Sequence, residues 1–275
     1  MSNLRAGCRR VGHGRRRILW LVPALAAALI SGFSGRADAQ SGRGIHVPFD
    51  SLLRVFVSDG LVDYDGFQRS PDFARYLSTL ATTNPSSLGR DDRLAFWINA
   101  YNAYTIAQIN AHGERKSIRN INRRLGGLGP SGAWSELMAT VGGRKYTLDQ
   151  IEHEQIRPVF REPRVHFALV CAALGCPPLR AEAYAGSTLD AQLNDQGHRF
   201  LSESPTKNRV DRDARTVWLS PIFRWYGEDF GARTIDLLRA VAQFVPSEAD
   251  RAALTSGTLR VRWTEYDWTL NLRSR

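Results

Sequence analysis

The strongest pattern of apolar and polar positions lies in residues 91–112. Side chains suited to a protein core recur there at the spacing of one helix face: Leu94, Trp97, Ile98, Tyr101, Thr105 and Ile109. Asp91 and Asp92 precede them, at the end where the helix dipole favours negative charge. The pattern predicts a helix over residues 91–112. Asn99 and Asn102 are three residues apart and project from one side of that helix.

Weaker patterns of the same kind predict further helices. They cover residues 50–58, 71–80, 189–201, 223–230 and 234–244. Thr147 and Gln150 have the spacing of a capping box, in which two side chains satisfy the first backbone groups of a helix. We expect that helix to end near Gln155, because Pro158 cannot continue it.

Extended segments are fewer than helices. Residues 164–171 form a nearly continuous apolar run with β-branched members, which is typical of a central strand buried on both faces. Residues 209–219 have the pattern of a hairpin, and residues 259–264 that of a late strand. The sequence therefore predicts an α+β fold, with α/β as the alternative. It would be a helix-rich single domain around a small mixed sheet, with the buried central strand near 164–171.

The first 39 residues differ from the rest of the chain. Arginines precede an apolar run over residues 18–30, and Ala37 and Ala39 have the small-x-small spacing that a signal peptidase requires. The run is shorter than the roughly 20 residues of a transmembrane helix. We therefore expect a cleavable signal peptide at 1–39, a domain at 40–275, and a periplasmic or secreted protein. No stable membrane anchor is expected after cleavage.

The predicted signal peptide also changes the charge of the protein. It holds seven of the 37 basic residues and one of the 27 acidic residues, so the formal charge falls from +10 to +4 on cleavage. The remaining sequence has no basic stripe and no nucleic-acid motif. We therefore expect no nucleic-acid partner.

Several phrases of the sequence resemble one family in the same order along the chain. They are residues 62–64, 95–103, 148–153, 166–171, 175–179, 222–226, 229–230 and 266–268. In these phrases the chain resembles the domain of unknown function 547 (DUF547) family. The resemblance implies no cofactor and no reaction.

Candidate chemistry is concentrated around two cysteines. Cys171 would end the buried strand and Cys176 would lie in the turn beyond it, a common position for active residues. A cysteine-dependent hydrolase or acyl transferase also needs a base and an orienting group. The candidates are His153 with Asp149 on one helix face, His166 as a second base, and Asn99 or Asn102 to orient the imidazole. On a regular strand, His166 and Cys171 would point to opposite faces.

Other interpretations of these residues stay open. In an oxidising compartment Cys171 and Cys176 are candidates for a structural disulfide that pins the turn. A metal site built from His153 and His166 with a carboxylate follows no compact ligand motif, and we predict no metal and no cofactor. The late tryptophans could line a groove for a small-molecule or peptide ligand. The alternative to an enzyme is thus a non-enzymatic envelope binding or interaction module, and the sequence leaves the choice open.

Overall fold

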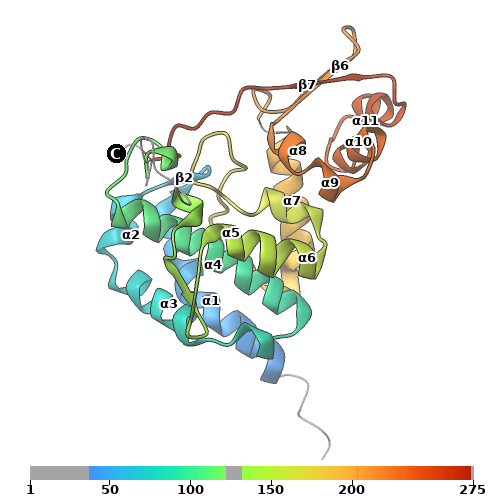
Figure 1. The fold of residues 1–275 in the computed structure, drawn as a ribbon. Coiled ribbons are helices and arrows are strands. Elements are labelled where there is room, and N and C mark those ends of the chain that lie inside the picture. Colours follow the sequence, from blue (N-terminus) through green and yellow to red (C-terminus); the bar gives the residue numbers. More distant parts are fainter. Residues whose placement is uncertain (1–36, 122–131, 203, 274–275) are drawn as a thin grey trace, which may run out of the picture. The chain divides into compact units, whose positions relative to one another are not determined.

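The computed structural model describes residues 37–121, 132–202 and 204–273, which belong to one compact unit. The expected signal peptide lies outside these residues except for its last three positions. The fold is α+β and rich in helices, as predicted (Figure 1). No helix in the described residues is long and apolar enough to cross a membrane.

The N-terminal elements come first in the described chain. They are α1 (Ala37–Phe56), β1 (Val57–Ser58), β2 (Leu61–Val62), α2 (Tyr64–Arg69), α3 (Pro71–Thr82), η1 (Pro85–Ser87), α4 (Arg90–Ala111), η2 (Ile118–Asn120), η3 (Ala133–Ser135), β3 (Ala139–Val141) and β4 (Arg144–Tyr146). The predicted long helix is α4. It is buried from Leu94 to Asn110 because α1, α2, α3, α5 and η4 pack around it (Figure 1). A helix surrounded on all sides carries core residues on every face.

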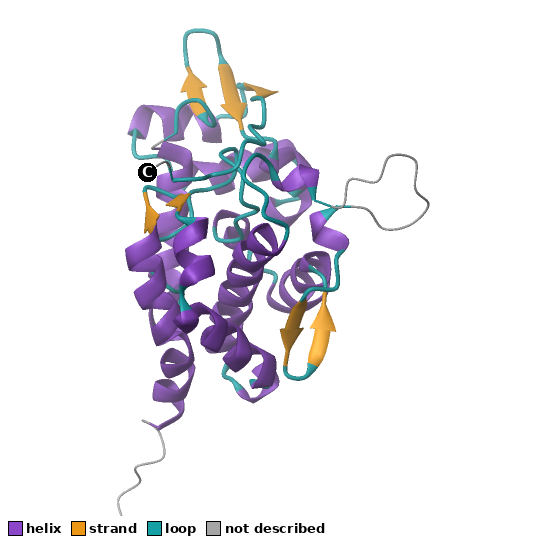
Figure 2. Cartoon of the chain, turned by 90° about the vertical axis from the view of Figure 1, so that its left-hand side faces the viewer, coloured by secondary structure: helices purple, strands orange, loops and turns teal. Residues whose placement is uncertain are grey.

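The remaining elements begin at the predicted capping box. They are α5 (Leu148–Gln150), the π-helical turn η4 (Ile151–Ile156), α6 (Arg157–Phe160), η5 (Pro163–Phe167), η6 (Gly186–Thr188), α7 (Leu189–Ser202), β5 (Arg209–Asp211), β6 (Thr216–Leu219), α8 (Ile222–Trp225), α9 (Gly227–Phe230), α10 (Thr234–Ala242), α11 (Glu248–Thr255) and β7 (Arg260–Trp263). Strand β6 pairs antiparallel with β5 and parallel with β7. This is a small mixed sheet, and the strands of the described chain are short pieces beside the helices (Figure 2).

The prediction of a buried central strand at 164–171 is wrong. The segment is buried, but residues 163–167 form the 3-10 turn η5 and residues 169–171 pair with no strand. Glu162 accepts from the backbone N–H of Arg164 and Pro163 follows it, a combination that starts a helical turn. The Asn102 side chain then bonds the backbone of Ala168 and Val170 in place of a neighbouring strand.

The helix that starts at the capping box does not stop before Pro158, contrary to prediction. Thr147 and Gln150 form the box, but the chain then widens into the π turn η4. The N–H of Arg157 bonds the carbonyl of Glu152, five residues back, and the helix continues past Pro158 to Phe160. A π turn changes the direction in which the following side chains point, and such turns are frequent at functional sites.

Two hydrophobic clusters make up the core. The first gathers around α1–α4 and η4, and the second around Phe167, α7, β6 and α8–α11. Tyr266, in the segment after β7, packs against both clusters. The junction of the two clusters is therefore marked by this C-terminal segment.

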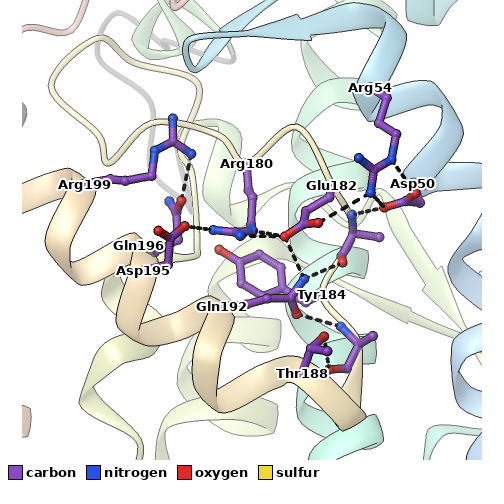
Figure 3. Close-up of polar contacts among 12 residues, drawn as sticks. Asp50, Arg54, Arg180, Glu182, Tyr184, Thr188, Gln192, Asp195, Gln196 and Arg199 are labelled. Carbon is purple, nitrogen blue, oxygen red and sulfur yellow. Dashed lines mark hydrogen bonds and ion pairs between the residues drawn. The ribbon is translucent and has the colours of Figure 1, made fainter.

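A polar network fixes the loop that follows Cys176. Arg180 bonds Glu182 of the same loop and Asp195 of α7, and Glu182 also pairs with Arg54 of α1 (Figure 3). Asp50 of α1 accepts from the backbone N–H of Ala183 at 2.9 Å. The loop is thus held between α1 and α7.

Candidate functional site

A cavity of about 310 Å³ lies where the two hydrophobic clusters meet. Its walls combine aromatic rings, two carboxylates, one histidine and both cysteines of the described domain. The lining residues are Tyr101, Trp134, Asp149, Glu152, His166, Leu169, Cys171, Cys176, Ile222, Trp225, Tyr226, Tyr266 and Trp268. Pockets with a few polar groups in apolar walls are typical ligand sites.

His166 is the best-oriented of these groups. Turn η5 carries it, and only 3% of the residue is exposed. Its Nε2 lies 2.7 Å from Oδ2 of Asp229, and its ring stacks on Tyr226 with centroids 4.1 Å apart. With a proton on Nε2, the neutral ring leaves Nδ1 free to accept a second proton.

Asp229 holds His166 and is itself held by Arg157. The guanidinium of Arg157 donates to both Asp229 oxygens, at 2.7 and 3.0 Å. The hydrogen bond with His166, reinforced by Arg157, keeps the pKa of Asp229 well below its usual range. Asp229 therefore stays an anion that can fix the imidazole ring.

Two carboxylates from the capped helix line the same cavity. Glu152 is 6% exposed, and its Oε1 lies 3.8 Å from Nδ1 of His166. Asp149 accepts a 3.3 Å hydrogen bond from Ser135. Burial, together with the negative charge of Glu152, raises the pKa of Tyr226 well above its usual value. The floor of the cavity is therefore acidic.

Cys171 and Cys176 lie at disulfide distance from each other. The Tyr266 hydroxyl is 3.2 Å from the sulfur of Cys171 and 3.0 Å from that of Cys176. Cys171 is partly exposed, whereas Cys176 is 2% exposed. The two sulfurs thus differ in their access to the cavity.

Pairing with the C-terminal segment shapes the turn between the cysteines. Ala172 has a positive φ of 61°, which is uncommon for a residue with a side chain. The N–H of Gly175 donates to the carbonyl of Asp267 at 2.8 Å. A Cβ on Gly175 would lie 2.9 Å from the Asp267 nitrogen, so this approach requires glycine. The pairing brings Tyr266 and Trp268 to the cavity.

Aromatic rings form the rim. Trp225 and Trp268 stack with centroids 5.9 Å apart, and Tyr266 lies 4.9 Å from Trp225 and 4.5 Å from Trp268. Trp134 meets Trp268 edge-on at 6.0 Å. Trp225 is 46% exposed although it is a large apolar side chain. A partly open aromatic rim is suited to stacking against a ligand.

Four of the predicted site residues line this cavity: Cys171, Cys176, His166 and Asp149. The expectation that His166 and Cys171 point to opposite faces of a strand is wrong, because their segment is a turn followed by irregular chain. Both residues reach one cavity as a result.

His153 lies elsewhere. It is exposed, its Nδ1 contacts Arg157 at 2.9 Å, and it lines a separate, charged hollow of about 480 Å³ with Arg157 and Asp229. Asp149, expected to contact it, bonds Ser135 instead. Asp149, just before the π turn, and Glu152, within it, line the cavity, whereas His153 faces the charged hollow.

Asn99 and Asn102 anchor loops instead of lining the cavity. Asn99 donates to the carbonyl of Tyr184 at 2.8 Å and accepts from its N–H at 2.9 Å. Asn102 makes the same pair of bonds to Ala168 and Val170, both at 2.9 Å. Asn102 thereby fixes the chain between His166 and Cys171.

Several residues of the site were not singled out as catalytic by the sequence. Asp229 is 63 positions from His166, and no spacing rule joins them. Tyr226, Tyr266, Trp268 and Asp229 do lie within phrases that resemble the DUF547 family, which was the available signal. Among the described residues, no group of three or more His, Cys, Asp or Glu side chains is arranged to hold a metal ion.

The fold and the cavity together define a helix-rich α+β protein with an aromatic, acidic site that contains a His–Asp pair and a cysteine pair. Residues 85–201 match the model of the family described as "Protein of unknown function, DUF547". The chain is therefore a DUF547 domain-containing protein, as its sequence resemblance indicated. No curated protein and no solved structure matches the chain. The matched residues include His166 and both cysteines, whereas Asp229 and Tyr266 follow them.

Proposed function

We propose that the protein is a cysteine- and histidine-dependent hydrolase or acyl transferase that acts after export from the cytoplasm. The observation that carries this proposal is the position of His166. It is held by Asp229 at 2.7 Å and lines the same cavity as Cys171. A nucleophile, a base and a group that orients the base are the parts that covalent acyl transfer requires.

The proposed roles follow from exposure and hydrogen bonding. Cys171 is the nucleophile because it is the more accessible sulfur. His166 takes the thiol proton and later returns it to the leaving group, and Asp229 fixes the tautomer of His166. The hydroxyl of Tyr266, 3.2 Å from the Cys171 sulfur, can donate to the thiolate. Attack forms an S–acyl bond, expels the leaving group, and water or an acceptor then releases the acyl group.

The disulfide-distance pair sets a condition on this chemistry. While Cys171 is bonded to Cys176 it has no free thiolate and cannot attack an acyl carbon. A thiol reductant must first supply two electrons and two protons to give two thiols. The proposed enzyme is therefore inactive when oxidised and active when reduced.

A test measures hydrolysis of an activated acyl substrate, p-nitrophenyl acetate, by protein prepared with and without a thiol reductant. We expect turnover in the reduced protein alone, its loss in Cys171→Ala, and turnover without any reductant in Cys176→Ala. Equal rates in the oxidised protein, the reduced protein and Cys171→Ala would contradict a cysteine mechanism.

A second candidate is a non-enzymatic binding module in which the cysteine pair is a structural disulfide. Two observations favour it: the sulfurs lie at disulfide distance, and aromatic rings dominate the rim. Under this candidate, reduction lowers the free energy of unfolding, by about 2–3 kcal/mol for so short a loop, and creates no turnover. Comparison of the oxidised and reduced protein therefore distinguishes the enzyme from the binding module.

A further inference from the structure

We propose that the aromatic cavity recognises a positively charged group, of the alkylammonium class, on its ligand or substrate. The inference rests on the proposed function only in placing the ligand in this cavity. It holds whether or not Cys171 is catalytic.

The first support is negative charge that nearby cations compensate only in part. Glu152 is 6% exposed and Asp149 is partly buried, and both line the cavity. In the described part of the chain, no arginine or lysine lies within ion-pair distance of either carboxylate. His166 is 3.8 Å from Glu152, but its hydrogen bond goes to Asp229. A buried carboxylate is costly without a paired cation, so a cationic ligand is stabilised there.

Arg157 neutralises this charge only in part, although it interacts electrostatically with Glu152. Its guanidinium is occupied by both oxygens of Asp229 and by Glu228. The carboxylates of Asp229 and Glu228 offset the charge of Arg157. Even if His166 is protonated, the groups around the cavity floor carry more negative than positive charge. A cation entering the cavity therefore meets an attractive field that is poorly screened by water.

The hydroxyl groups of three tyrosines lie in the same negative field. Burial is the main cause that raises the pKa of Tyr101, Tyr226 and Tyr266, and the charge of Glu152 raises each of them further. A field that opposes a new anion favours a cation in the same place.

The walls supply the second support. Trp225, Trp268, Tyr226 and Tyr266 surround the cavity, and a cation over an aromatic face is attracted by the ring. The chain already makes this contact at two rings of the cavity: the Arg119 guanidinium lies 5.2 Å from the centroid of Trp268, and that of Arg157 lies 5.2 Å from the centroid of Tyr226. A volume of about 310 Å³ is at the lower end of ligand pockets and accommodates a small organic cation.

The test compares choline with its uncharged isostere 3,3-dimethylbutan-1-ol by isothermal titration calorimetry at low ionic strength. We expect choline to bind at least about 10-fold more tightly than the alcohol, which corresponds to about 1.4 kcal/mol. Glu152→Gln should remove most of this preference. Glu248→Gln, which makes the same charge change at an exposed position on α11, should leave it unchanged.

The experiment is done on Cys171→Ala, which cannot form an acyl-enzyme, so binding is measured apart from catalysis. If Glu152→Gln fails to fold by circular dichroism, Asp149→Asn provides the second variant. Equal affinity for choline and the alcohol would overturn the inference. So would binding of a neutral sugar such as glucose in the absence of any choline binding.

Discussion

Replacement of Asn102 by leucine is expected to lower the free energy of unfolding by about 2–6 kcal/mol. The amide of Asn102 is 3% exposed and bonds the carbonyl of Ala168 and the N–H of Val170, both at 2.9 Å. Leucine removes both bonds and leaves two buried backbone groups without partners, each of which costs about 1–3 kcal/mol. Urea unfolding followed by circular dichroism measures the change.

Asn84→Ala is the matched control. Asn84 is exposed and caps the turn η1 by accepting from the N–H of Ser86 at 3.0 Å. Loss of an exposed cap costs about 1 kcal/mol. If Asn102→Leu also lowers the free energy of unfolding by no more than about 1 kcal/mol, Asn102 does not hold the chain before Cys171.

The second large effect concerns catalysis. Asp229→Asn is expected to lower kcat/KM of the reduced protein by about 10²–10⁴ on p-nitrophenyl acetate, because general-base catalysis contributes on this scale. Asparagine can hydrogen bond His166 but does not hold the tautomer whose Nδ1 is free, and it supplies no charge to stabilise the imidazolium. Steady-state kinetics on the folded variant measure the loss.

Asp229 is a positioning residue, and its loss also weakens the contact with Arg157. Asp229→Glu separates the two roles, because it keeps a carboxylate near His166. We expect Asp229→Glu to recover at least about 10-fold of the activity lost in Asp229→Asn. A catalytic loss that simply follows the loss of folded protein in both variants would argue for a structural role alone.

Much of the helical part of the fold could be predicted because its signals are local. The 3.6-residue pattern of α4, the Thr147–Gln150 capping box and the β5–β6 hairpin each depend on neighbouring residues. Local signals are also ambiguous for short apolar runs. Residues 164–171 are buried, but a continuous apolar run does not distinguish a strand from a buried turn. A side chain on another element, Asn102, settles the choice.

The site was less predictable because its contacts join distant residues. Cys171, Cys176, His166 and Asp149 could be selected by chemistry alone. The partner of His166, however, comes from α9, and the Tyr266 hydroxyl comes from the segment that pairs with the cysteine turn. The selection of His153 assumed a regular α-helix, and the π turn before Pro158 removes that regularity. The periodicity of apolar residues along the sequence reveals neither contacts between distant residues nor local irregularities of a helix.

The proximity of Cys171 to a functional base is the central claim, and its chemical reactivity tests it without a known substrate. The reduced protein is treated with iodoacetamide at pH 7, and the alkylation rate of each cysteine is read by peptide mass spectrometry, with glutathione as the reference thiol. We predict that Cys171 reacts at least about 10-fold faster than glutathione, because proton transfer to His166 and a hydrogen bond from the Tyr266 hydroxyl stabilise the thiolate against the negative field of Glu152. We also predict that His166→Asn removes this advantage. A Cys171 rate no higher than that of glutathione, or one that does not change in His166→Asn, would contradict the account.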